Sequence, residues 1–209
     1  MKKSLCLLRH ASIDRVYQGH YIGQKDVSLS SEGLLEIERV RKELPSQFLG
    51  GKIFLSPAKQ CLETLASLQI DRDPSLEYKD ELKEFDFGDW EGYSFRELGT
   101  GHLAELTEWA NFAPGFRFPN GESIGEIISR AEKFKDIVLS SKHKNILILS
   151  HGGILSLLLC LLLGMPASFY LKFRILPSTI VFLEVYQNGE ASMVKIVPSN
   201  LQRRCEWPG

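Results

Sequence analysis

The sequence lacks any excess of charge and any long apolar run, and both absences exclude classes of partner. Its 25 basic and 26 acidic residues leave a formal net charge of -1 over 209 residues. A chain without a basic surplus has no electrostatic footprint for nucleic acid or for an anionic membrane surface. The most apolar stretch, residues 154–163, is about half the length that a membrane-spanning helix needs. We therefore expect no nucleic-acid or membrane partner, and any recognition of an anion must be local.

Cysteine is also scarce and unpatterned. The chain has four cysteines, at Cys6, Cys61, Cys160 and Cys205. They show neither Cys-x-x-Cys spacing nor the density of a disulfide framework, which predicts reduced thiols in a cytoplasmic protein, three of them packed as small hydrophobic side chains. The basic N-terminus resembles a signal peptide only faintly, because Arg9 and His10 end the apolar run too early.

No internal repeat, low-complexity tract or linker divides the chain, so we predict a single domain over residues 1–209. Strands are predicted at 4–8, 52–55, 145–150, 179–186 and 192–197, and helices at 31–44, 58–68, 123–140 and 152–163. Because each of the first three strands precedes a helical pattern, the order predicts a three-layer α/β/α domain with a mostly parallel central sheet. The pair Asn188-Gly189 predicts a hairpin that adds one antiparallel edge.

The segment 92–121 stands apart from this alternation, because it is rich in aromatic residues, Gly and Pro. A long excursion between core elements is often a lid or a specificity wall, and we predict a lid-like insertion here. A satellite hydrophobic cluster is an equally good interpretation of the same residues. Ser123 and Glu126 follow it as a capping-box pair, which predicts the start of the next helix.

Two histidines occupy matching settings far apart in the chain. His10 follows an apolar run and Arg9, and His151 follows another apolar run and precedes Gly152-Gly153. Buried parallel strands have such apolar runs, and ligands of open α/β sheets bind beyond their carboxyl ends. Arg9 supplies a fork of donors for an anion, and Gly152 is a predicted binding position because glycine lets a helix start approach a ligand. Either histidine alone would be a structural residue; together they predict an anion site.

The segment 81–92 places several acidic residues among Phe85, Phe87 and Trp90. A solvated acidic loop is the ordinary interpretation of such a run, but the aromatic residues weaken it here. A carboxyl group held against aromatic surface has a raised pKa, because its charged form is disfavoured. Such a group can protonate a leaving group near neutral pH.

Five motifs occur in one order along the chain. They are Leu-Arg-His at 8–10, Asp-x-x-Leu-Ser-x-x-Gly at 26–33, Leu-x-Glu-x-x-Phe-Gly-x-Trp-Glu-Gly at 82–92, Pro-Asn-Gly-Glu-Ser at 119–123 and Ser-His-Gly-Gly at 150–153. In this order the set resembles the histidine phosphatase superfamily, with its phosphoglycerate-mutase-like fold, from about residue 5 to 177. Gly19-His20-Tyr21-Ile22-Gly23 is further similar to the α-ribazole-phosphate phosphatase-like branch.

The resemblance implies a role for each matching residue. His10 would be the nucleophile that takes the phosphoryl group, and Glu84 would donate a proton to the leaving group and then activate water. Arg9 and His151 would bind the phosphoryl oxygens, and the backbone near Gly23 would border the substrate. No metal or cofactor is implied, because cations and N–H donors take its place.

At three positions the chain departs from the family pattern. Gln60 stands where the family has a second phosphate-binding arginine, Ala11 replaces a glycine and Val16 replaces an asparagine. Losing one preorganised donor to a developing oxyanion costs roughly 2.7–4 kcal/mol, so a slow phosphatase is expected, although Gln60 keeps an amide donor for the substrate. Lys59 lies about 100° around a helix from position 60 and cannot replace the arginine. Arg15, in the loop beside the lost asparagine, is the predicted replacement.

Three activities fit these residues. The predicted function is hydrolysis of a small organic phosphomonoester through a phosphohistidine, with an α-ribazole 5'-phosphate-like molecule as one candidate substrate. A catalytically impaired member that binds a phosphorylated ligand is one alternative, and a phosphoglycerate mutase is another. Beyond 92–121 the chain has no long insertion that would keep water from a phosphorylated enzyme, which favours hydrolysis. No pattern in the sequence predicts the oligomeric state.

Overall fold

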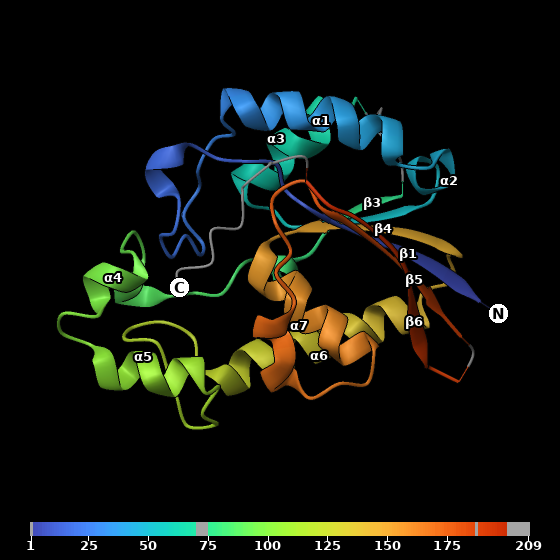
Figure 1. Ribbon diagram of the computed structural model, residues 1–209. Helices are drawn as coiled ribbons and strands as arrows, with labels where there is room; N and C mark the ends of the chain where they lie inside the picture. The colour runs from blue at the N-terminus through green and yellow to red at the C-terminus, as the bar shows by residue number, and fades with distance from the viewer. Residues whose placement is uncertain (1, 70–74, 187, 200–209) are drawn as a thin grey trace.

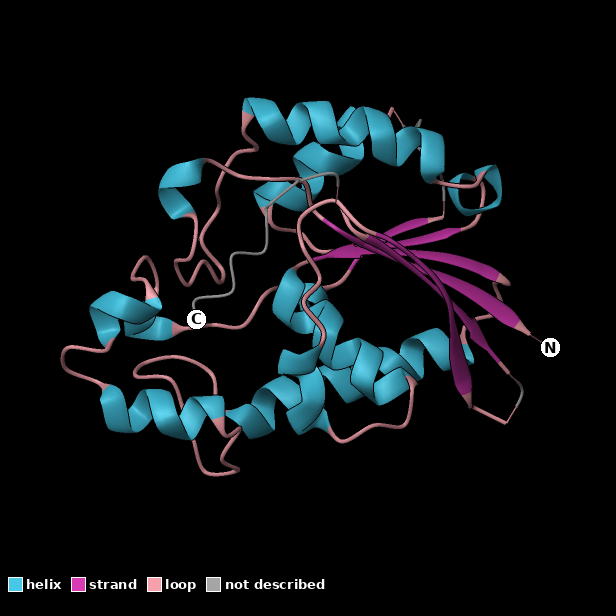
Figure 2. Ribbon diagram, viewed as in Figure 1, coloured by secondary structure: helices cyan, strands magenta, loops and turns pink. Residues whose placement is uncertain are grey.

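A six-stranded sheet lies between two layers of helices (Figure 2). The computed structural model describes residues 2–69, 75–186 and 188–199. The strands are β1 (Lys3–Arg9), β2 (Lys52–Leu55), β3 (Leu76–Tyr78), β4 (Asn145–Ser150), β5 (Ile180–Val185) and β6 (Ala191–Val197). Their spatial order is β3-β2-β4-β1-β5-β6, in which the first four are parallel and β5 is antiparallel to both neighbours. The predicted α/β/α class with an antiparallel edge is confirmed.

The helices cover both faces of the sheet (Figure 1). The α-helices are α1 (Ser31–Glu43), α2 (Ser46–Leu49), α3 (Lys59–Ser67), α4 (Phe95–Leu98), α5 (Leu103–Ala110), α6 (Ile124–Ser140) and α7 (Gly152–Leu162). Short 3-10 turns are η1 (Arg15–Tyr17), η2 (Asp80–Leu82), η3 (Gly88–Trp90) and η4 (Ala167–Lys172). Helices α1, α2 and α3 lie over one face, α6 and α7 lie over the other, and α4 and α5 extend away from the sheet.

The two cores explain why the central strands are continuous apolar runs. Along β1, Leu5 and Leu7 belong to the core that α6 and α7 close, whereas Cys6 and Leu8 belong to the core that α1, α2 and α3 close. Strand β4 alternates in the same way. Since successive side chains of a strand point to opposite faces, a strand covered on both sides needs apolar residues at every position.

Most element boundaries match the predictions within a residue. The predicted ranges of β2 and β4 are those observed, and the capping box of Ser123 and Glu126 is present at the start of α6. Strand β3 was missed, because three residues at the sheet edge, none of them fully buried, have no readable period. Asn188-Gly189 lies between β5 and β6 as predicted, with Gly189 at a φ of 84°.

Four aromatic residues of 92–121 share a buried cluster with residues of helices α6 and α7, namely Trp109, Phe112, Phe116 and Phe118. The rings of Trp109 and Phe118 lie 4.7 Å apart, and both share a cluster with Ile154 and Leu157 of α7. Helix α7 therefore lies between this cluster and the sheet, which explains why it is apolar all round. The satellite-cluster interpretation accounts for these contacts, and the lid and the single-domain boundaries stay predictions.

Burial also accounts for the thiols and for the apolar helix. Cys6, Cys61 and Cys160 are buried free thiols, as predicted, while Cys205 lies outside the described residues. Within 2–69, 75–186 and 188–199, no helix has the length and apolar character that crossing a membrane requires.

Candidate active site

The two histidines of the sequence motifs follow neighbouring strands. Strands β1 and β4 pair in parallel with Arg9 opposite Ser150, so His10 and His151 leave the sheet side by side. The backbone N–H of His10 donates to the carbonyl oxygen of Ser150 at 2.9 Å. As a result, the two ring centroids lie 5.1 Å apart with the planes at 64°.

The ring of His10 is held so that one nitrogen is free. Its Nδ1 lies 2.8 Å from the carbonyl oxygen of Ala11. A carbonyl oxygen can only accept, so Nδ1 carries the proton and Nε2 keeps its lone pair. Burial, and then the charge of Arg9, lower the pKa of His10 to about 3, so the ring is neutral at physiological pH. These contacts leave a neutral, oriented imidazole at the end of β1.

A pocket of about 580 Å³ opens over His10. Its walls come from the loop after β1, the start of α1, the segment before η3, and the segment that leads into β5. The lining residues are Arg9, His10, Ser12, Ile13, Asp14, Arg15, Tyr17, Gln18, Gly19, His20, Tyr21, Ile22, Ser30, Glu32, Gln60, Glu84, Phe87, Arg174, Leu176 and Pro177. No residue of 92–121 is among them, so the aromatic segment does not form its wall.

Arg9 lines this pocket and carries a side-chain donor without a partner among the described residues. Its Nη1 donates to the carbonyl oxygen of Ile175 at 2.7 Å, and its Nε is buried without a hydrogen-bond partner in the described part of the chain. A Cβ at Gly152 would lie 2.8 Å from Nη1, so the glycine admits the guanidinium to the start of α7. A buried donor without a partner is costly unless a ligand satisfies it, which fits an anion site.

Glu84 is held on the N-terminus of α7. Its two carboxylate oxygens accept the backbone N–H groups of Gly153 (2.8 Å), Ile154 (3.0 Å) and Phe85 (3.1 Å). A Cβ at Gly153 would lie 2.7 Å from Glu84 Oε1, so only glycine allows this approach. Burial raises the pKa of Glu84, although the N–H of Gly153 and the charge of Arg9 oppose it. The carboxyl group can therefore hold a proton at higher pH than an exposed glutamate.

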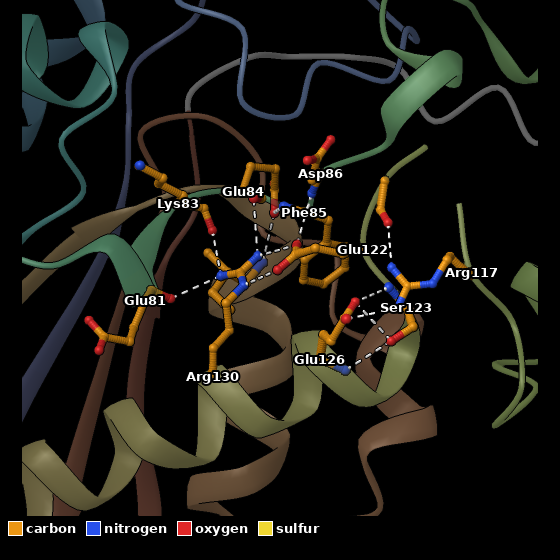
Figure 3. A network of polar contacts seen from close by, with 12 residues as sticks. Glu81, Lys83, Glu84, Phe85, Asp86, Arg117, Glu122, Ser123, Glu126 and Arg130 are labelled. Carbon is orange, nitrogen blue, oxygen red and sulfur yellow. Dashed lines mark hydrogen bonds and ion pairs between the residues drawn. The ribbon is translucent and has the colours of Figure 1, made fainter. Parts of the chain in front are cut away.

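Arg130 of α6 fixes the backbone that carries Glu84 (Figure 3). Its guanidinium donates to the carbonyl oxygens of Glu81 (3.0 Å), Lys83 (2.8 Å) and Glu84 (3.1 Å). It also makes a two-pronged ion pair with the carboxylate of Glu122, at 2.7 and 2.9 Å. Sequence reasoning missed Arg130, because a single arginine on a helix carries no signal of the loop that it contacts.

His151 is a neighbour of His10 but is not part of the pocket wall. Its side chain is 1% exposed, and its Nε2 lies 2.9 Å from Ser56 Oγ. Burial, and then His10 and Arg9, lower the pKa of His151 well below the usual value. Ser56 was given no role from the sequence, and its contact with His151 was not predicted.

The remaining predicted positions are placed differently from one another. Gln60 is buried and lines the pocket, and its Oε1 has no partner within the described residues. Arg15 also lines the pocket, but its Nη2 pairs with Glu32 at 2.9 Å. Gly23 and Gly152 are absent from the lining; Gly23 packs against the backbone of Phe85, while the three residues before it border the pocket.

Two further polar residues of the wall, His20 and Arg174, were not among the site residues predicted from the sequence. His20 lines the pocket and lies 3.7 Å from Glu97. Arg174 also lines the pocket; it lies far from His20 along the chain, in the segment between η4 and β5. Among the described residues, no group of three or more His, Cys, Asp and Glu side chains is arranged to hold a metal ion.

Several known proteins are similar to this chain in sequence and fold. The adenosylcobalamin/alpha-ribazole phosphatase of Salmonella typhimurium is 30% identical over 176 residues, which cover 82% of this chain and 85% of that protein. The protein of the same name from Escherichia coli is 29% identical over 172 residues, covering 82% and 84%. The crystal structure of the alpha-ribazole phosphatase from Shigella flexneri superimposes with a TM-score of 0.80 at 27% identity, over 94% of this chain and 96% of that chain. A family model for the histidine phosphatase superfamily, branch 1, matches residues 5–197, and this chain belongs to that superfamily.

Proposed function

We propose that this protein hydrolyses phosphomonoesters through a phosphohistidine formed on His10. One observation carries the proposal: a neutral imidazole with a free Nε2 lines a pocket beside the unpartnered Nε of Arg9. A lone pair and an unused cationic donor, side by side, suit attack on a phosphorus atom whose oxygens are held by the arginine. The phosphatase names of the relatives support the same reaction class.

The first step would transfer the phosphoryl group. His10 Nε2 attacks phosphorus, the bond from phosphorus to the ester oxygen breaks, and that oxygen leaves with the bonding electron pair. Glu84, whose pKa burial raises, gives its proton to the leaving oxygen, so an alcohol rather than an alkoxide departs. Arg9 draws charge from the phosphoryl oxygens throughout.

The second step would restore the enzyme. The Glu84 carboxylate takes a proton from a water molecule as the water oxygen attacks phosphorus. The bond between phosphorus and Nε2 breaks, and inorganic phosphate leaves. Three backbone N–H groups stabilise the carboxylate between the two steps, so the same side chain can serve as acid and then as base. Contact between His151 and the phosphoryl oxygens stays a prediction, since its side chain is buried and is not among the pocket lining.

The substrate would carry an organic group larger than a sugar. Tyr17, Tyr21, Phe87 and Leu176 line the pocket and offer apolar surface to a leaving group. An α-ribazole 5'-phosphate-like molecule fits this description, and the relatives from Salmonella typhimurium and Escherichia coli are named for that activity. Gln60 in place of an arginine would make turnover slow.

The test compares His10→Ala with His143→Ala, an exposed histidine outside the site. We expect hydrolysis of p-nitrophenyl phosphate to be lost in His10→Ala and kept in His143→Ala. Intact mass after acid-free quenching should show one added phosphoryl group on the wild-type protein. Equal rates for His10→Ala and wild type would overturn the proposal and favour a binding protein.

Two further measurements separate the alternatives. Glu84→Gln should slow an alkyl phosphate far more than p-nitrophenyl phosphate, because nitrophenolate leaves without a proton. Clear turnover of 3-phosphoglycerate in the presence of 2,3-bisphosphoglycerate, at a rate above that of α-ribazole 5'-phosphate hydrolysis, would identify a mutase instead.

A further inference from the structure

Arg9 alone does not supply enough positive charge to balance a bound phosphomonoester. A phosphomonoester is a dianion near neutral pH, whereas Arg9 supplies one positive charge and His10 is neutral there. His151 is neutral as well, and Gln60 carries no charge at a buried wall position. A site with these residues needs one more cation to match its ligand.

The described pocket wall offers two other arginines, Arg15 and Arg174. Arg15 is already paired with Glu32 at 2.9 Å, so binding an anion would require that ion pair to be shared or broken. Arg174 has neither a hydrogen bond nor an ion pair among the described residues. Its guanidinium is therefore the available cation of the wall.

The backbone around Arg174 is fixed on both sides. The carbonyl oxygen of Phe173 lies 2.7 Å from Ser156 Oγ on α7, and the carbonyl oxygen of Ile175 accepts from Arg9 Nη1 at 2.7 Å. Arg9 is thus bonded to the residue next to Arg174, which places the two arginines on one short stretch of wall. Burial is the main cause that lowers the pKa of Arg9, and the positive charge of Arg174 lowers it further.

We propose that Arg174 is the second cation of the phosphoryl site, where it binds the phosphoryl oxygens together with Arg9. Two like charges near each other are unfavourable in the empty pocket and become favourable when a dianion lies between them. The inference rests on the proposed function, because it assigns Arg174 to the same phosphoryl group that His10 receives. In this proposal Arg174, rather than Arg15, supplies the positive charge that is missing at position 60, where the chain has Gln60.

The experiment measures inorganic phosphate and vanadate as inhibitors of p-nitrophenyl phosphate hydrolysis. In Arg174→Gln we expect both inhibition constants and the KM to rise about tenfold to a hundredfold, as for the loss of one charged hydrogen bond. Arg174→Lys should keep part of the affinity. Lys172→Gln is the matched control, because Lys172 lies two residues away over the ring of Phe169 and outside the pocket wall.

A double variant tests the compensation directly. Gln60→Arg should recover phosphate affinity in the Arg174→Gln background and add much less to the wild-type protein. If Arg174→Gln leaves the phosphate and vanadate constants unchanged while His10→Ala abolishes turnover, the inference is wrong and the proposed function stands. A rise in KM confined to substrates with a second anionic group would also overturn it, since Arg174 would then bind the leaving group. Turnover that survives His10→Ala defeats the proposed function itself.

Discussion

Gly153 is the position at which one added methyl group should disturb the candidate acid. In Gly153→Ala the new Cβ would lie 2.7 Å from Glu84 Oε1 and 3.1 Å from Phe85 Cε2. The ring of Phe85 is packed among other aromatic rings, whereas Glu84 borders the pocket, so the carboxylate is the group with room to move. Its movement would lengthen or break its bond to the N–H of Gly153, which is 2.8 Å in the native protein.

The size of the effect follows from two opposing terms. Losing one hydrogen bond to a charged group costs about 1.5–3 kcal/mol, while alanine in place of glycine in a helix recovers about 1 kcal/mol. The net loss in the free energy of unfolding is therefore about 0.5–2 kcal/mol. For a chain of this length, that corresponds to a fall in Tm of about 1–8 °C.

Activity gives a second readout. Because the N–H of Gly153 is the strongest of the contacts that lower the pKa of Glu84, its loss should raise that pKa further. The basic limb of the pH–rate profile should move to higher pH, and kcat should fall because the proton donor is displaced.

Gly125→Ala is the matched control, since Gly125 also lies in the first turn of a helix and a Cβ there meets only Ser123 Oγ, at 3.9 Å. We expect this variant to be unchanged in activity and more stable by up to about 1 kcal/mol. If Gly153→Ala matched Gly125→Ala in both stability and pH profile, the steric reasoning would be refuted.

Three other outcomes are expected. The free energy of unfolding should fall as pH decreases below about 6.5, because the unfolded chain binds a proton at His10 that the folded protein, with a pKa of about 3, refuses. At pH 5 this loss of unfolding free energy amounts to about 2 kcal/mol. Urea unfolding of His10→Gln should lack this loss, and an identical pH dependence in both proteins would contradict the low pKa of His10. Gly152→Ala, whose Cβ would lie 2.8 Å from Arg9 Nη1, should raise the inhibition constant of phosphate, and an unchanged constant would argue against Arg9 as its ligand. Arg130→Lys should lower stability by about 3 kcal/mol and reduce kcat more than it changes KM, as measured by thermal unfolding and steady-state kinetics; a variant with wild-type kcat would show that the Arg130 contacts do not position the acid.

The sequence predicts those parts of the site that follow from local pattern. His10 and His151 could be brought together in advance, because each follows an apolar run and parallel strands end at one edge of a sheet. Glu84 is recognisable from its motif and its aromatic neighbours. The helix starts at Ser30 and Ser123 follow from capping chemistry, which depends on residues three positions apart.

The contacts that depend on tertiary proximity could not be predicted. Arg130 reaches a loop more than forty residues earlier in the chain, and Ser56 meets a histidine from another strand. Arg15 was chosen because it lies in the loop beside Val16, yet its guanidinium forms an ion pair with Glu32. Arg174 sits in a segment with no period and no motif, so only the fold shows that it lines the same pocket as Arg9.

The separation of the two imidazoles is set by the ladder between β1 and β4, in which Arg9 lies opposite Ser150. The loops between those two strands can therefore change in length and sequence without altering the distance between the two imidazoles. A single deletion inside β4 would instead turn His151 toward the other side of the sheet. This arrangement therefore predicts that relatives differ in the length and sequence of their loops, whereas the lengths of β1 and β4 stay constant.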